Sequence, residues 1–129
     1  MQSKVLKPTS NPDTVNDERG GIFTWVPDES IEEFNLVYIN KGFTRGHHYH
    51  PEFTEYFLVV KGEGVMYVQD KTTKTEDQHF MSVGSCMVHP KGVAHTFYAH
   101  TDVLAIAMIT KPWTKCSKPI KRKVFKTIK

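Results

Sequence analysis

Short runs rich in β-branched and aromatic residues dominate the middle of the chain, and they restrict the fold more than any other feature. Eight such runs occupy residues 21–26, 35–39, 55–60, 65–69, 79–83, 86–89, 93–99 and 103–109. Turn-forming stretches such as KGEG (61–64), DKTTK (70–74) and PKG (90–92) separate most of them. Many short strands with regular turn signals predict an all-β, antiparallel sandwich or barrel.

The flanking segments differ from these runs, and the 129 residues fit about one domain. We expect residues 1–20 to form an N-terminal arm with an edge strand at 4–7, and residues 21–110 to form the barrel. Residues 28–34 could add one helical turn. Residues 111–129 form a basic C-terminal extension that we expect to pack on the barrel.

Composition and charge narrow the function classes. No run of about 18 apolar residues occurs, which argues against a membrane-spanning helix. The N-terminal residues lack an apolar signal segment, and Cys86 and Cys116 fit no paired motif, so we expect a cytoplasmic protein with free thiols. We find no helix-turn-helix pattern and expect no nucleic-acid partner.

One segment carries residues suited to metal binding. His48 and His50 are two residues apart, so on an extended strand both imidazoles face the same side. Glu55 shares the face of an apolar strand, where a carboxylate needs a partner, and His95 lies on a later apolar strand. Three imidazoles and a carboxylate would suit Zn, Fe, Ni, Mn or Co. The alternative is that these histidines are ordinary core or surface residues.

The spacing of glycines around these residues resembles the two sequence motifs of the cupin superfamily. The first pattern consists of Gly42, His48, His50, Glu55 and Gly62. The second consists of Gly84, Pro90, Gly92 and His95, with Ala99 where the family often has asparagine. The resemblance implies a double-stranded β-helix, a jelly-roll barrel with a pocket at its open mouth. It also implies that one divalent metal ion (Zn, Fe(II), Ni or Mn) binds His48, His50, Glu55 and His95.

A narrower resemblance concerns the substrate. Four segments of the chain are similar to the cupin modules of sugar-nucleotide isomerases and epimerases of capsule and O-antigen synthesis. These segments are DERGGIF, FNLVYI, GFTRGHHYH and EYFLVVKGEG. This implies a metal-dependent isomerase or epimerase that acts on a sugar or nucleotide sugar through an enediolate. The alternatives are a small non-haem iron dioxygenase and a non-catalytic carbohydrate-binding or sensor cupin.

Further residues are candidates for catalysis and substrate binding. His89 is the first candidate acid or base, followed by Tyr67 and His79, although each could serve in packing or face solvent. Arg45 and Lys91 could bind a phosphate or pyrophosphate. We also expect two aromatic residues on the ligand-bearing faces, Phe57 and Phe97, to contact substrate. Apolar edge strands predict a homodimer.

The C-terminal extension combines charge with apolar residues. It holds eight basic residues and no acidic one, while the preceding 110 residues hold nine basic and fourteen acidic residues. Ile120, Val124 and Ile128 share the spacing of one helix face, so we expect docking on the acidic body. The alternative is that the cations attract an anionic substrate toward the barrel mouth.

Overall fold

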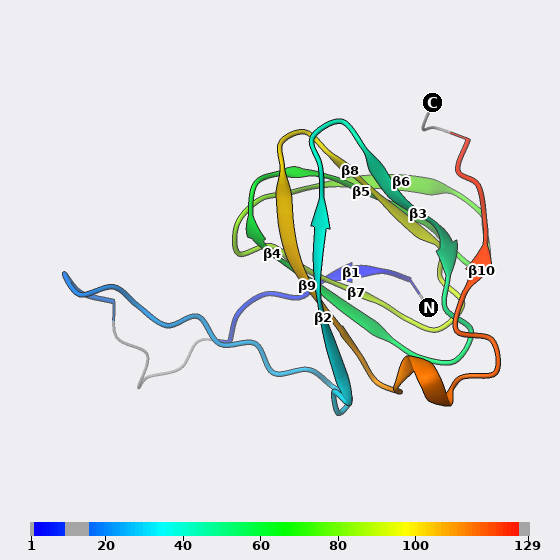
Figure 1. Cartoon of the computed structure of the whole chain (residues 1–129), viewed down its shortest axis with the longest axis horizontal. Helices are drawn as coiled ribbons and strands as arrows, with labels where there is room; N and C mark the ends of the chain where they lie inside the picture. The colour runs from blue at the N-terminus through cyan, green and yellow to red at the C-terminus, as the bar shows by residue number, and fades with distance from the viewer. Residues whose placement is uncertain (1, 10–15, 127–129) are drawn as a thin grey trace.

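The computed structural model describes residues 2–9 and 16–126, which form two antiparallel five-stranded sheets (Figure 1). The first sheet has the strand order β1 (Lys4–Val5), β7 (Cys86–His89), β4 (Glu55–Lys61), β9 (Val103–Ile109) and β2 (Glu33–Ile39). The second has the order β10 (Lys121–Arg122), β3 (Thr44–Tyr49), β8 (His95–Ala99), β5 (Gly64–Gln69) and β6 (Glu76–Met81). The predicted all-β, antiparallel fold is therefore confirmed.

The core lies between the two sheets and follows the alternation of each strand. Along β9 every second residue is buried, and Val59 on the neighbouring β4 is fully buried as well. Phe57 on β4 meets Phe97 on β8 with ring centroids 5.5 Å apart, which joins the sheets across the interior. The hydrophobic residues that led to the strand predictions thus supply the layer that closes the barrel.

Residues 21–26 form no strand, contrary to the prediction. Thr24 makes an isolated bridge with Thr9, and the segment extends away from the barrel (Figure 1). Ile22, Phe23 and Val26 are mostly exposed. These residues have high β propensity, but no neighbouring strand in the described part of the chain offers them a continuous ladder of hydrogen bonds. Residues 10–15 of the predicted arm lie outside the described residues.

Two helical expectations are also wrong. Residues 28–34 contain no helical turn, because β2 starts at Glu33 and pairs with β9 along its whole length. The C-terminal extension contains a 3-10 helix at Trp113–Lys115 and then the short strand β10, rather than a helix that unites Ile120 with Val124. Ile128 lies outside the described residues. In the described part, no helix is long and apolar enough to cross a membrane.

Candidate metal centre

A cavity of about 780 Å³ opens between the two sheets, within the range of small-molecule sites. Its polar end is formed by His48, His50, Glu55 and His95. Phe57, Met66, Phe97, Ala107 and Ile109 form apolar walls. The four residues that the sequence singled out for metal binding therefore line one cavity.

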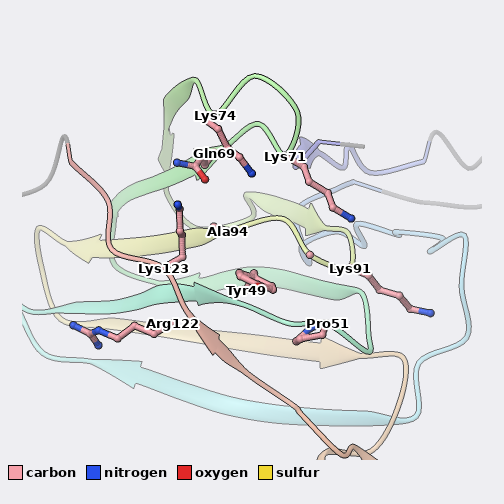
Figure 2. A pocket seen from close by; sticks show the side chains of 10 residues that line it. Tyr49, Pro51, Gln69, Lys71, Lys74, Lys91, Ala94, Arg122 and Lys123 are labelled. Atoms are coloured by element: carbon pink, nitrogen blue, oxygen red, sulfur yellow. The ribbon is translucent and has the colours of Figure 1, made fainter.

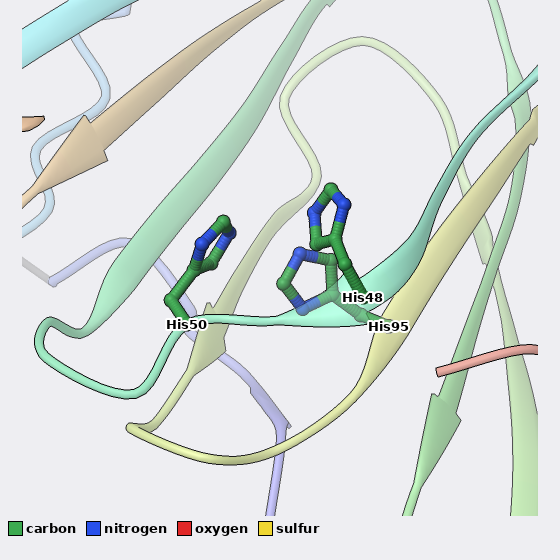
Figure 3. A group of neighbouring side chains, drawn as sticks. All are labelled: His48, His50 and His95. Carbon is green, nitrogen blue, oxygen red and sulfur yellow. The ribbon is translucent and has the colours of Figure 1, made fainter. Parts of the chain in front are cut away.

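The three histidines converge at this end of the cavity. One imidazole nitrogen from each of His48, His50 and His95 lies within 4.8 Å of the corresponding nitrogens of the other two. Figure 3 shows the three rings gathered together, from β3, from the residue that follows it and from β8. A bulge in β3 between Gly46 and His48 brings His48 opposite His95. Gly46 has φ 132°, and a Cβ there would lie 2.5 Å from the Thr96 Cα, so this crossing requires glycine.

Backbone carbonyls fix the orientation of two of these rings. Nδ1 of His50 lies 2.9 Å from the Pro119 carbonyl oxygen, and Nδ1 of His95 lies 3.3 Å from the Val93 carbonyl oxygen. Because a carbonyl oxygen only accepts, each Nδ1 carries the proton in these contacts. In the neutral rings, each Nε2 therefore presents a lone pair, which is the tautomer that ligates a metal ion.

The two lone pairs face a carboxylate oxygen. Glu55 Oε1 lies 2.9 Å from His50 Nε2 and 3.4 Å from His95 Nε2, and all three residues are buried. His50 Nε2 has no hydrogen-bond partner among the described residues, despite this short distance. Lone pairs that face a carboxylate repel it unless a cation lies among them. Three imidazole nitrogens within 4.8 Å of one another, with the Glu55 carboxylate against two of these rings, therefore fit a divalent metal ion.

Burial and proximity shift two of the pKa values. Burial acts to raise the pKa of Glu55, but hydrogen bonds and positive charge from His50 and His95, when these rings also carry a proton on Nε2, outweigh it and hold this pKa well below its ordinary value, as a cation among the same atoms would. Burial, together with the neighbouring His95 and His50, lowers the pKa of His48 to about 3. His48 is therefore neutral and able to ligate at neutral pH.

The structure separates the other candidate residues by position. Arg45, Phe57 and Phe97 line the cavity beside the histidines, and Arg45 makes no ion pair within the described residues. Lys91 lines a different cavity. Tyr67 and His79 are not among the described residues that line the histidine cavity.

His89 lies behind the cluster rather than in the cavity. Its ring stacks on that of His95 with centroids 4.1 Å apart, and its Nδ1 lies 2.7 Å from Ser3 Oγ. Burial lowers the pKa of His89 well below its ordinary value. Its position suits support of the His95 ring rather than contact with a molecule in the cavity.

The sequence reasoning missed several residues at this site. Glu33 lines the cavity, and its carboxylate accepts hydrogen bonds from the Trp113 backbone N–H and the Asn35 side chain, both at 3.0 Å. Trp113 also lines the cavity. Pro119 supplies the acceptor for His50. Trp113 and Pro119 belong to the C-terminal extension, and no motif there indicates a return to the site.

Comparison with solved structures finds the same fold in a capsular polysaccharide assembling protein and in two enzymes solved with bound nucleotide sugars. The capsular polysaccharide assembling protein CapF of Staphylococcus aureus matches with a TM-score of 0.67 and 21% identity, over 90% of this chain and 33% of CapF. The 3'-monoepimerase ChmJ of Streptomyces bikiniensis, in complex with dTDP-quinovose, matches with a TM-score of 0.72 and 18% identity, over 85% of this chain and 64% of ChmJ. This chain thus spans about a third of the length of CapF.

A third match involves a shorter protein. The 3,4-ketoisomerase QdtA of Thermoanaerobacterium thermosaccharolyticum, solved as a mutant in complex with TDP-4-keto-6-deoxyglucose, has a TM-score of 0.73 and 12% identity, over 94% of this chain and 87% of QdtA. A search of curated proteins found no match.

A family model supplies the remaining comparison. The model described as Cupin matches residues 10–115, which include both glycine-and-histidine motifs. The two-sheet barrel and the histidines gathered inside it agree with that match, and the chain belongs to the cupin family.

Proposed function

We propose that this cupin is a metal-dependent isomerase or epimerase that acts on a sugar or nucleotide sugar through an enediolate. The observation that carries the proposal is the pair of Nε2 lone pairs, from His50 and His95, that face the buried Glu55 carboxylate in a cavity of ligand size. His48, His50, Glu55 and His95 would hold one divalent ion, either Zn, Fe(II), Ni or Mn. Such an ion would polarise a substrate carbonyl and stabilise the developing oxyanion.

The chain's own residues divide the remaining tasks. Phe57 and Phe97 form apolar walls that exclude water around the sugar. Arg45 lines the cavity without an ion-pair partner in the described residues, and it suits the phosphate groups of a nucleotide sugar. His89 holds the His95 ring by stacking and acts as a positioning residue.

We assign the proton transfer to Glu33. Among the described residues that line the cavity, Glu33 and Glu55 are the two that carry a carboxylate. Two hydrogen bonds fix the orientation of the Glu33 carboxylate. Its carboxylate would take a proton from the carbon beside the substrate carbonyl to give the enediolate. Return of the proton to the former carbonyl carbon, with the hydroxyl proton passing from one oxygen to the other, would complete isomerisation; epimerisation would need a second proton donor, such as a water molecule, on the opposite face of the same carbon.

Deuterium incorporation tests this function. The protein is loaded with each of the four metals and incubated with TDP-4-keto-6-deoxyglucose in D2O, and deuterium beside the carbonyl is followed by NMR. We expect incorporation with at least one metal, and loss of more than 95% of the rate in both Glu33→Gln and His50→Ala. His100→Ala, which changes an exposed histidine away from the cavity, serves as the control. Oxygen consumption with Fe(II) and no deuterium incorporation would instead support the dioxygenase.

We also propose a homodimer. The edge strand β2 exposes Phe34, Leu36 and Tyr38 on one face, each more than 60% exposed, and its outer edge pairs with no strand in the described residues. An apolar edge strand of this kind suits pairing with a second copy. Light scattering should give the dimer mass for the wild type and the monomer mass for Leu36→Lys. A monomeric wild type at micromolar concentration would contradict the proposal.

A further inference from the structure

A second cavity lies on the outer side of the barrel and has different chemistry. Its volume is about 500 Å³, and it shares no lining residue with the histidine cavity among the described residues. We call it the outer cationic cavity after five of its lining residues, namely Lys71, Lys74, Lys91, Arg122 and Lys123. The described residues that line it include no aspartate or glutamate.

These five cations come from three separate segments. Lys71 and Lys74 belong to the β5–β6 turn, Lys91 to the β7–β8 turn, and Arg122 and Lys123 to the C-terminal extension. Within the described part of the chain, none of the five forms an ion pair. Five positive charges around one cavity, with no carboxylate among its described lining residues, favour a bound anion.

The C-terminal extension is attached firmly enough to hold its two cations in place. β10 pairs with β3, and the backbone N–H of Lys123 donates to the His47 carbonyl oxygen at 2.6 Å. Phe125 is buried at 2% exposure, and its N–H donates to His47 Nδ1 at 3.1 Å. Arg122 and Lys123 are therefore part of a built wall rather than of a solvated tail.

The other two segments are also fixed by backbone hydrogen bonds. Gly92 N–H donates to the His50 carbonyl oxygen at 2.9 Å, which anchors the turn that carries Lys91. Gln69 N–H donates to the Ala94 carbonyl oxygen at 3.1 Å, which joins the end of β5 to the same region. The cavity thus has a defined shape before any ligand binds.

The side-chain amide of Gln69 points into this cavity. Gln69 is 8% exposed, and its side chain makes no hydrogen bond within the described residues. Figure 2 shows its amide directed into the space that Lys74 and Lys123 approach from opposite elements. Gln69 is not among the buried polar groups left without a partner, so its NH₂ group is open to the cavity and can donate to a ligand oxygen there.

We propose that the outer cationic cavity binds an oligophosphate, meaning a chain of two or three phosphate groups. A single carboxylate carries one negative charge and could not balance five unpaired cations, whereas several phosphate groups could. The cavity volume is also large enough for several phosphate groups. Arg122 can bind two phosphate oxygens at once, while the lysines act as point charges. The oligophosphate could be free or belong to a nucleotide, in which case the Tyr49 ring in the lining can contact the base.

The direct test is calorimetric titration in 150 mM salt with inorganic triphosphate and, separately, with ATP. We expect saturable binding of at least one probe, with a dissociation constant raised at least tenfold in Lys71→Ala/Lys123→Ala. The matched control, Lys41→Ala/Lys61→Ala, removes two exposed lysines elsewhere and should stay within twofold of wild type. Tighter binding of ATP than of triphosphate would indicate a nucleotide, and equal binding would indicate the phosphate chain alone; both support the proposal.

Two further variants test whether the Gln69 amide contributes to binding and whether binding is independent of the histidine cavity. Gln69→Met removes the amide but keeps the side-chain length, and we expect binding weakened about threefold to tenfold. His50→Ala should retain oligophosphate binding, so failure of the proposed enzymatic function would leave this result unaffected. The proposal is overturned by an absence of saturable binding, by equal losses in the control pair, or by single-stranded RNA that displaces both probes at lower concentration.

Discussion

The histidine cavity and the outer cationic cavity use opposite faces of the same strand. On β3, His48 lines the inner cavity, with His50 directly after the strand, while Tyr49 between them lines the outer cavity. The inner cavity has few charges, apolar walls and directed ligand atoms. The outer cavity has many charges and fewer apolar residues in its lining. Side-chain alternation thus lets one strand separate a coordination site from an electrostatic site.

The two cavities also depend, for the most part, on different segments of the fold. The inner ligands lie on or next to strands that belong to both sheets and face the core, so barrel formation itself brings them together. The outer cations lie on turns and on the C-terminal extension, and two of them depend on the attachment of β10 and Phe125. Substitutions of the side chains that line one cavity should therefore leave the other largely intact, although Trp113 and Pro119 of the extension also reach the inner cavity.

The largest expected effect is on the inner cavity. His50→Ala removes a ligand whose Nδ1 is fixed by Pro119, so we expect metal affinity to fall more than a hundredfold while the barrel stays folded. Elemental analysis after dialysis measures the bound metal, with His100→Ala as the control. Full metal stoichiometry in His50→Ala would show that the ligand assignment is wrong.

Phe125→Ala tests the dependence of the outer cavity on the extension. Loss of a fully buried phenyl ring should lower the free energy of unfolding by about 3 kcal/mol. It should also weaken oligophosphate binding, because Arg122 and Lys123 lose their anchor. Urea unfolding and calorimetry measure the two effects.

The neighbouring residue provides a matched control for this variant. Val124 is 56% exposed, so Val124→Ala should change neither quantity appreciably. A Phe125→Ala protein with wild-type stability would mean that the extension does not dock as described.

Acid should destabilise the metal-free protein through the inner cluster. The pKa of His48 is about 3 and that of His89 is well below its ordinary value, both chiefly through burial. Below about pH 6.5 the unfolded chain binds protons at these positions while the folded protein does not. Stability should therefore fall as the pH falls, by about 1 kcal/mol per pH unit for each histidine.

Urea unfolding of the metal-free protein between pH 7 and 5 measures this slope. His89→Gln should make the slope shallower, whereas His100→Gln, at an exposed position, should leave it unchanged. A stability that is independent of pH over this range would contradict the neutral, buried state of these rings.

The smallest expected effect is a difference in how strongly ligand binding at the two cavities depends on ionic strength. Raising NaCl from about 50 to 500 mM should weaken triphosphate binding by about tenfold, because salt screens exposed charges. Metal binding by buried ligands should change by less than twofold. Parallel titrations in both salt concentrations measure the contrast, and an equal salt dependence at both sites would contradict it.

The sequence predicted the inner cavity better than the outer one. His48, His50, Glu55 and His95 follow from strand alternation and from motif spacing, both of which are local patterns. Phe34 lies within the predicted helical turn but belongs to β2, because pairing with β9 outweighs local preference.

Residues from the C-terminal extension could not be placed in advance. Pro119 contacts a histidine 69 positions earlier, and Trp113 reaches the cavity through a 3-10 turn. The outer cavity joins turns and a tail segment whose proximity depends on the closed barrel. The charges of Lys71 and Lys123 were visible in the sequence, but their proximity was not.

The central claim is that His48, His50, Glu55 and His95 hold one divalent ion. Anomalous diffraction from crystals of the zinc-loaded protein, recorded above and below the zinc edge, tests it most directly. The account predicts one strong peak within bonding distance of the three histidine nitrogens and of a Glu55 carboxylate oxygen. A fully loaded protein whose peak lies elsewhere, or is bound by other residues, would contradict it.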